Sequence, residues 1–199
     1  MLAACFGDDN ASYNGAMRAE KSSVSDLLVL QRPGTYILLL CLSLRQFIEV
    51  GKLGEFEFPA GYYLYVGSAL GPGGLAARLR RHKKLANDSE KRLHWHIDFL
   101  REQAQLLEIW CTPQPQRLEH EWAGVIGHSP ETNALVPGFG SSDCSCESHL
   151  YQFALMPDNL AIAEHSSPVL KHLREAIRLL KPETDLIVIK NDDSSQRKA

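Results

Sequence analysis

An aromatic strand, a glycine-rich turn and a basic helix follow one another directly in this chain, and this run constrains its fold most. Residues 61–66 read Gly-Tyr-Tyr-Leu-Tyr-Val, which is typical of a buried strand, and residues 67–74 carry four glycines and a proline. Leu75 and Leu79 then recur four apart and predict a helix that reaches about Ala86. A strand that leads through such a turn into a helix N-terminus can bring backbone N–H groups and arginines to a phosphate.

Two further apolar runs predict strands that pair with this one. Residues 35–42 are almost continuously apolar, which favours a central strand covered on both faces, and residues 106–111 form a third such run. The other periodic segments predict helices at 95–103, 118–127 and 169–180 and strands at 150–155 and 186–189. We therefore expect an α/β (α+β) fold: a small central, mainly antiparallel three-stranded sheet flanked by helices, elaborated by a C-terminal strand and helix.

The pattern predicts one domain with an extension at each end. A length of 199 residues suits a single hydrophobic core. Residues 1–32 are mostly small and polar, which predicts a partly disordered N-terminal extension, and residues 33–156 hold the predicted domain. Residues 157–199 predict a C-terminal extension with a short helix, a strand and a polar tail.

The charge distribution is more informative than the total charge. A formal net charge of −3 is not that of a strongly basic nucleic-acid-binding protein. Between residues 75 and 92, however, seven lysines and arginines, Arg81 and Lys83 among them, face only two acidic residues. This local basic face keeps nucleic acid open as a partner.

The cysteines and the hydropathy indicate a cytoplasmic protein. The chain has five cysteines, and Cys41 and Cys111 lie inside apolar runs, as reduced core thiols do. No run approaches the roughly 18 apolar residues of a membrane span, so we expect no membrane contact. The sequence carries no signal for an oligomeric state.

Two short motifs give the chain a family resemblance. Gly34-Thr35-Tyr36 opens the first predicted strand, and Tyr65-Val66-Gly67 ends the second, followed by Leu75-Ala76-Ala77-Arg78. Together they resemble the GIY-YIG nuclease superfamily, with Thr35 where that family usually has isoleucine. The surrounding sequence, about residues 34–154, is similar to the branch called domain of unknown function 123, the Uri-type endonuclease-like proteins.

The resemblance implies a divalent-metal-dependent endonuclease, with DNA as the favoured substrate and Mg²⁺ or Mn²⁺ as the cofactor. The implied catalytic residues are Tyr36, Tyr65, Arg78, His82 and Glu119. In these roles Tyr36 assists deprotonation of water, Arg78 and Tyr65 stabilise the phosphate, and His82 assists proton transfer. A guanidinium suits the phosphate because it is permanently charged and bidentate. The glycine-rich turn and the basic helix supply the expected substrate-binding residues, which are Gly67, Ser68, Gly73, Gly74, Arg81 and Lys83.

Two glutamates compete for the metal-binding role. Glu119 and Glu121 flank the apolar stripe of the predicted helix 118–127 on opposite sides, and helical geometry leaves both open. The family pattern, a glutamate with a large apolar residue three positions later, fits Glu119 and Trp122. We therefore expect Glu119 to hold the metal, with Glu121 as the alternative.

Three other interpretations remain open from the residues alone. The domain could bind nucleic acid without cutting it. Cys144, Cys146 and His149 could hold zinc in an interaction domain, with a fourth ligand from elsewhere. His94 and Asp98, four apart at a helix start, could hold a metal, although a capping role is more common for such an aspartate.

Overall fold

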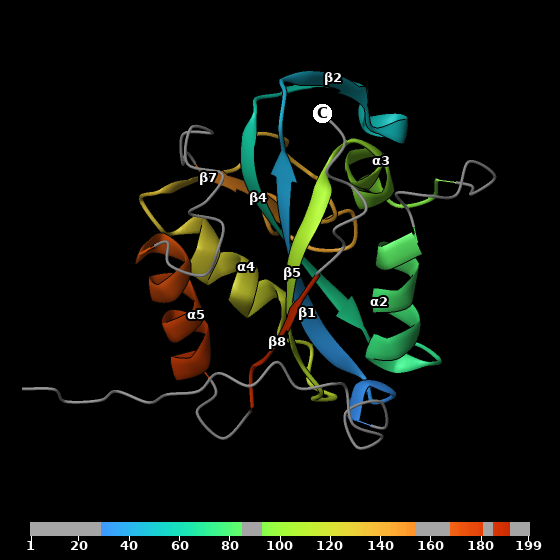
Figure 1. Cartoon of the computed structure of the whole chain (residues 1–199), viewed down its shortest axis with the longest axis vertical. Coiled ribbons are helices and arrows are strands. Elements are labelled where there is room, and N and C mark those ends of the chain that lie inside the picture. Colours follow the sequence, from blue (N-terminus) through green and yellow to red (C-terminus); the bar gives the residue numbers. More distant parts are fainter. Residues whose placement is uncertain (1–28, 85–92, 154–167, 181–184, 192–199) are drawn as a thin grey trace, which may run out of the picture.

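The computed structural model describes residues 29–84, 93–153, 168–180 and 185–191, and its centre is an antiparallel sheet (Figure 1). Each pairing between the described strands is antiparallel. In spatial order the strands are β6 (Thr132–Asn133), β7 (Leu150–Phe153), β4 (Gly61–Ala69), β1 (Gly34–Leu42), β5 (Gln105–Thr112) and β8 (Ile187–Lys190). The mixed α/β fold with a mainly antiparallel sheet is thus as expected, but the described sheet has six strands rather than three.

The three strands predicted for the sheet correspond to β1, β4 and β5, which are neighbours inside the six-stranded sheet. β1 and β4 pair along their whole length, from Gly34 opposite Ala69 to Leu42 opposite Gly61. β5 pairs with the other edge of β1. The additional strands β7 and β6 extend the sheet beyond β4, and β8 extends it beyond β5. Such pairings join segments far apart in the chain, and local periodicity does not report them.

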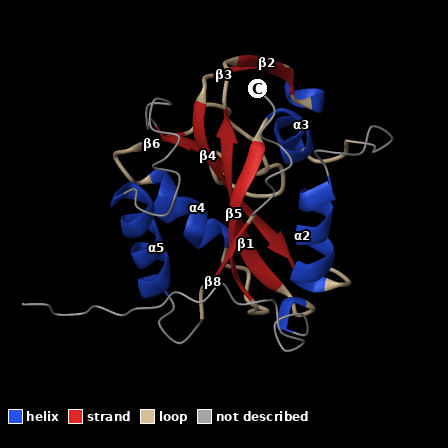
Figure 2. Cartoon of the chain, in the orientation of Figure 1, coloured by secondary structure: helices blue, strands red, loops and turns tan. Residues whose placement is uncertain are grey.

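Helices cover both faces of the sheet (Figure 2). They are α2 (Gly74–Lys84), α3 (His96–Gln103), α4 (Glu119–Gly127) and α5 (Pro168–Leu180). Leu38 and Leu40 of β1 are buried in the same cluster as apolar residues of α2 and α3. Ile37 and Leu39 are buried with apolar residues of α4 and α5. Two covered faces explain why β1 is apolar at nearly every position.

A small two-stranded sheet is separate from the main sheet. β2 (Gln46–Glu49) and β3 (Glu55–Phe58) form a two-stranded antiparallel sheet joined through the 3₁₀ helix η1 (Gly51–Leu53). Turn residues of the sequence bound both strands, since Gly51 and Lys52 follow β2 and Pro59-Ala60-Gly61 follows β3.

Several predicted features lie outside the described residues. They are the N-terminal extension up to residue 28, the helix end near Ala86, the basic residues Lys91 and Arg92, and the polar tail from residue 192. Within the described part of the chain, no helix is both long enough and apolar enough to cross a bilayer. The four described cysteines are all free thiols, and Cys41 and Cys111 are buried, as predicted.

Candidate active site

A cleft of about 410 Å³ lies at the end of the sheet where β1 begins and β4 ends. Four of the five residues predicted to be catalytic line it: Tyr36, Tyr65, Arg78 and Glu119. The predicted substrate-binding residues Gly67 and Ser68 line it as well. The sheet register contributes to this arrangement because it places Tyr36 of β1 directly opposite Gly67 of β4.

His82, the fifth predicted residue, contacts Tyr36 rather than the cleft. Its side chain is fully buried, and Nε2 lies 2.8 Å from the Tyr36 hydroxyl. Burial lowers the pKa of His82 to about 3, so the ring is neutral at physiological pH. Among the described residues, Nδ1 of His82 is buried and has no hydrogen-bond partner, and an unpaired buried N–H is rarer than an unpaired acceptor. These facts favour the tautomer in which Nε2–H donates to Tyr36, leaving the tyrosine O–H to point elsewhere.

Both tyrosines of the cleft are protonated at neutral pH. Burial raises the pKa of Tyr36 and of Tyr65 well above the usual 10, although the nearby Arg78 opposes the effect. Their ring centroids are 6.5 Å apart, so the two hydroxyls belong to one site. A neutral phenol donates a hydrogen bond, and two such donors suit the oxygens of an anionic ligand.

Gly67 makes room for the Tyr36 ring. A Cβ atom at this position would lie 2.6 Å from Cζ and from the hydroxyl oxygen of Tyr36. The cross-strand partner of Tyr36 therefore has to lack a side chain for the ring to sit where it does. The position of the Tyr36 ring thus explains why the second motif has a glycine at position 67.

We expect Gly67→Ala to displace Tyr36 and to lower the free energy of unfolding by roughly 1–3 kcal/mol, the usual cost of overpacking a core. Urea denaturation measures this change. Gly124→Ala is the matched control because nothing lies within 4 Å of a Cβ built there, in the middle of α4. The control should leave stability unchanged or raise it by up to about 1 kcal/mol. Equal effects of the two substitutions would contradict the steric role of Gly67.

Arg78 is held over an aromatic ring, with its donors left available. Its guanidinium carbon lies 3.9 Å from the centroid of the Trp95 ring, and Arg81 lies 4.4 Å from the same ring. Arg81 also forms an ion pair with the buried Asp98. Arg78 has no carboxylate partner among the described residues, so its N–H groups can meet an anion in the cleft.

Asp98 caps the start of α3. Its Oδ2 accepts hydrogen bonds from the backbone N–H groups of His94 at 2.9 Å and Trp95 at 3.0 Å, besides the ion pair with Arg81. These interactions hold the pKa of Asp98 below its usual range against the opposing effect of burial, so it is a carboxylate. The capping interpretation is therefore confirmed, and the same oxygen is not available to pair with His94 in a metal site.

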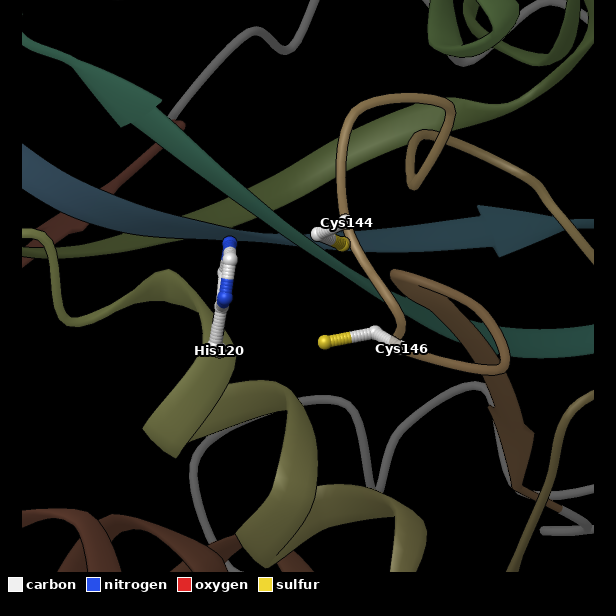
Figure 3. A group of neighbouring side chains, drawn as sticks. All are labelled: His120, Cys144 and Cys146. Atoms are coloured by element: carbon white, nitrogen blue, oxygen red, sulfur yellow. The ribbon is translucent and has the colours of Figure 1, made fainter.

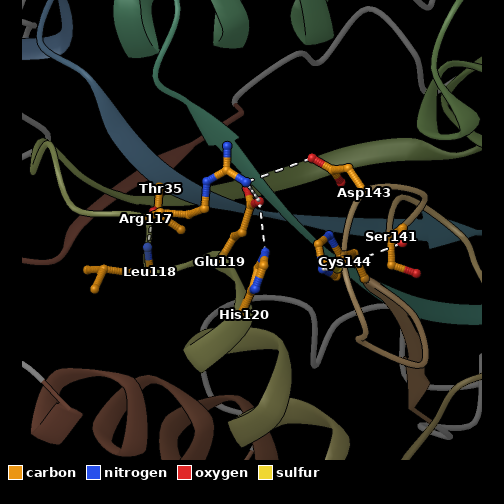
Figure 4. Close-up of polar contacts among 9 residues, drawn as sticks. Thr35, Arg117, Leu118, Glu119, His120, Ser141, Asp143 and Cys144 are labelled. Carbon is orange, nitrogen blue, oxygen red and sulfur yellow. Dashed lines mark hydrogen bonds and ion pairs between the residues drawn. The ribbon is translucent and has the colours of Figure 1, made fainter.

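The two candidate metal-binding glutamates have different environments. Glu119, the first residue of α4, is 5% exposed and lines the cleft, whereas Glu121 is exposed and does not line it. Arg117 Nη1 lies 3.8 Å from Glu119 Oε1 and 3.8 Å from Asp143 Oδ2, which also belongs to the cleft (Figure 4). The structure thus brings Glu119, and not Glu121, to the tyrosines and Arg78.

Thr35 helps to position Glu119, and sequence reasoning missed this role. Its side chain is fully buried, and Oγ1 accepts a hydrogen bond from the backbone N–H of Leu118 at 3.3 Å (Figure 4). This contact fastens the start of α4 to β1 immediately before Glu119. A hydroxyl within an otherwise apolar strand was the available signal, because a buried hydroxyl needs a hydrogen-bond partner.

The loop of residues 138–149 forms one wall of the cleft. Gly140 N–H donates to His96 Nδ1 at 3.0 Å, and a Cβ at Gly140 would lie 2.9 Å from the Tyr65 ring. The carbonyl of His149 accepts a hydrogen bond from β4 at 2.9 Å. The loop is therefore fixed to both α3 and the sheet, and its backbone approaches Tyr65 too closely for a side chain at position 140.

Four of the predicted substrate-binding residues do not line the cleft. Gly73 and Gly74 have positive φ angles of 82° and 54° and form the turn into α2. The Gly74 N–H is used within that turn by a hydrogen bond of 3.1 Å to the Gly71 carbonyl. Arg81 is engaged with Asp98, and Lys83 is exposed at the end of α2.

We expect His82 to make the fold sensitive to acid. Its pKa is about 3 in the folded protein against 6.5 for an ordinary histidine, so between these values the unfolded chain binds a proton that the folded one does not. Stability should therefore fall as the pH falls below 6.5, by roughly 1 kcal/mol per pH unit from this group.

Urea unfolding of wild type and of His82→Gln between pH 7 and pH 4.5 measures this contribution. The variant should lose stability less steeply with acid than the wild type. His128→Gln, at an exposed position after α4, is the control and should follow the wild type. Parallel pH profiles for all three proteins would contradict the burial of a neutral His82.

The carboxylate oxygens at the start of α4 suit a hard divalent cation. Glu119 presents a carboxylate in an open cleft, and the carboxylate of Asp143 lies in the same cleft. Mg²⁺ prefers oxygen ligands and commonly takes one or two carboxylates while keeping several waters. The residues present therefore fit such an ion, and Glu119 is the candidate ligand.

The fold and the cleft define a mixed α/β protein with two tyrosines, an arginine and a glutamate converging at one end of an antiparallel sheet. The chain matches, over residues 35–171, the family described as Domain of unknown function DUF123, and it belongs to that family. No curated protein and no solved structure shows a significant match to it.

Proposed function

We propose that the cleft is the active site of a GIY-YIG-type endonuclease that hydrolyses phosphodiester bonds of nucleic acid, with DNA as the favoured substrate. The observation that carries the proposal is the convergence of Tyr36, Tyr65, Arg78 and Glu119 on one cleft. They come from β1, β4, α2 and α4, so their meeting is a product of the fold and not of sequence proximity. The neighbouring strands β1 and β4 carry the two motifs, and α2 carries the arginine that follows the second motif.

The arginine and the tyrosines supply the phosphate-binding part of the reaction. Phosphoryl transfer spreads negative charge over the non-bridging oxygens, and preorganised donors lower its barrier. Arg78 provides a permanent charge with bidentate donors, held in place by the Trp95 ring. Tyr65 donates a neutral hydrogen bond from the opposite strand. Ser68 and the backbone at Gly67 lie at the same end of the cleft.

Tyr36 orients the attacking water in this proposal. Because its pKa is raised by burial, it acts as a phenol and not as a preformed phenolate. A phenol that accepts a hydrogen bond from His82 can direct its own O–H into the cleft. His82, expected from the resemblance to assist proton transfer, is a weak base when buried, and we assign it the positioning of Tyr36 instead.

Glu119 would hold one Mg²⁺ or Mn²⁺ ion. When bound, such an ion acts as a Lewis acid on the phosphate and lowers the pKa of a coordinated water. Arg117 and Thr35 orient the glutamate from the side of β1, the first through its charge and the second through the Leu118 backbone.

The substrate range is tested with the purified protein on supercoiled plasmid, branched DNA, single-stranded DNA and RNA, each with Mg²⁺, with Mn²⁺ and with EDTA. We expect cleavage of at least one DNA substrate with either ion and none with EDTA. Binding of the same substrates without cleavage, under every metal condition, would favour the alternative of a non-cleaving nucleic-acid-binding module of the same fold.

A further inference from the structure

Two cysteines and a histidine from separate elements meet beside the cleft (Figure 3). Cys144 and Cys146 belong to the loop of residues 138–149, and His120 is the second residue of α4. The possible ligand atoms of the three residues all lie within 4.8 Å of one another, and all three side chains are half-buried. In Figure 3 the sulfur of Cys146 points toward the side of His120, and Cys144 lies close by.

A fourth ligand lies next to this group. His149 Nε2 is 3.4 Å from Cys144 Sγ, and the rings of His149 and His120 are 5.8 Å apart. The sequence alone placed Cys144, Cys146 and His149 together and left the fourth ligand unidentified. The fold supplies His120, which is distant in sequence from the loop.

The spacing is close to that of a tetrahedral zinc site. With Zn–S bonds of about 2.3 Å and Zn–N bonds of about 2.0–2.1 Å, the edges between ligand atoms are about 3.3–3.8 Å. The contact of 3.4 Å between Cys144 and His149 already has this length. The ligand atoms of His120, Cys144 and Cys146, which lie within 4.8 Å of one another, need to close by at most about 1.5 Å.

Two observations indicate that the contacts of these groups with the described residues are weak. His120 Nε2 is buried and makes no hydrogen bond within the described part of the chain, and its contact of 3.3 Å with Glu119 Oε1 is an ion pair only when the imidazole is protonated. A buried polar atom in this state costs free energy unless something else satisfies it. Neither cysteine forms a disulfide, and Cys144 Sγ makes a weak contact of 3.8 Å with the Ser141 carbonyl besides its contact of 3.4 Å with His149 Nε2.

We propose that Cys144, Cys146, His120 and His149 bind a structural zinc ion that fastens the loop of residues 138–149 to α4. Two thiolates and two imidazoles in tetrahedral array are the donor set of structural zinc and not of magnesium. Four protein ligands leave no open position, which assigns the ion a structural and not a catalytic role.

The zinc ion would stabilise the wall of the cleft formed by residues 138–149 without taking part in the proposed hydrolysis. Residue 119, immediately before the ligand His120, is the glutamate of the cleft, and His120 Nε2 lies 3.3 Å from its Oε1. His149 itself lines the cleft. The proposal goes beyond the proposed function and does not depend on it, because a bound zinc ion is detected whether or not the protein cuts nucleic acid.

The test begins with the metal content of the full chain, expressed with zinc in the medium and purified without chelators. We expect about one zinc ion per chain. Reconstitution of the metal-free protein with Co²⁺ should give the thiolate charge-transfer absorption and the strong visible bands of a tetrahedral site. If the wild-type protein contains no zinc and also gives no such spectrum with Co²⁺, the proposal is overturned by the wild type alone.

Variants then assign the ligands. Cys144→Ser, Cys146→Ser and His120→Asn should each lose most of the zinc and lower the melting temperature, and chelation should destabilise wild type but not Cys144→Ser. Ser145→Ala, at the exposed position between the two cysteines, is the matched control and should keep the metal. Glu119→Gln should also keep it. Zinc retained in all the ligand variants, or lost in Glu119→Gln, would overturn the proposed ligand set.

Discussion

Arg78→Ala is expected to lower the rate of nucleic-acid cleavage roughly a hundredfold to a thousandfold, the usual loss when one preorganised donor to a developing charge is removed. Arg78 is the cleft residue whose guanidinium has no carboxylate partner among the described residues, so its charge is available to the phosphate. Single-turnover cleavage at saturating protein measures the chemical step separately from binding. Arg78→Lys should recover only part of the rate, since it keeps the charge but loses the bidentate geometry.

A control variant and the stability of Arg78→Ala separate a specific role of Arg78 from a general loss of charge or of folding. Arg80→Ala removes an arginine from an exposed position of the same helix, and it should cleave at nearly the wild-type rate. The fold should survive Arg78→Ala because the contact with Trp95 contributes roughly 0.5–2 kcal/mol. If Arg78→Ala and Arg80→Ala slow cleavage equally, the effect is one of general charge and the assigned role of Arg78 is wrong.

Glu119→Gln is expected to reduce metal-dependent cleavage about a thousandfold or more, which corresponds to roughly 4 kcal/mol of transition-state stabilisation. The substitution preserves the shape of the side chain and removes the charge that would hold the cation. Calorimetric titration with Mn²⁺ should show that the variant has lost the corresponding binding event. Its zinc content should stay at the wild-type level, which separates the two metal sites.

Glu121→Gln is the matched control for this variant. It changes the same residue type on the same helix, at an exposed position that does not line the cleft. We expect its cleavage rate and Mn²⁺ binding to equal those of the wild type. The opposite result, with Glu121→Gln inactive and Glu119→Gln active, would show that the cleft as described is not the metal site.

The sequence predicts the central elements of this fold well because their signals are local. β1, β4 and β5 are apolar runs, and the amphipathic pattern places the start of α2 and both ends of α4 within one residue. The width of the sheet was not predictable in the same way. β6 has two residues, too few for a pattern, and β8 joins β5 across a long sequence separation.

The same distinction applies to the site. The paired motifs identify Tyr36 and Tyr65, and the structure brings both to one cleft with Arg78 and Glu119. What the motifs do not contain is the set of contacts that fixes these groups. The hydrogen bond from Leu118 to Thr35 joins residues 83 positions apart, and a contact of this kind leaves no periodic signal in the sequence.

Helix α4, which precedes the loop of residues 138–149, gives a second example of a contact that the sequence does not reveal. His120 follows Glu119 in an ordinary helical sequence, and nothing in its local pattern marks it as a metal ligand. Only the fold places it against Cys144 and Cys146. The glycine-rich turn is a different case: from the sequence we expect Gly73 and Gly74 to bind substrate, and in the structure both have positive φ angles and form the turn into α2.

The central claim is that this cleft hydrolyses nucleic acid with a divalent cation on Glu119. Nicking of supercoiled plasmid by wild type and by Glu119→Gln, at equal concentrations and with Mg²⁺, tests it most directly. The account predicts nicking by the wild type that EDTA abolishes and that Glu119→Gln lacks. Equal nicking by the two proteins, or nicking that persists in EDTA, would contradict it.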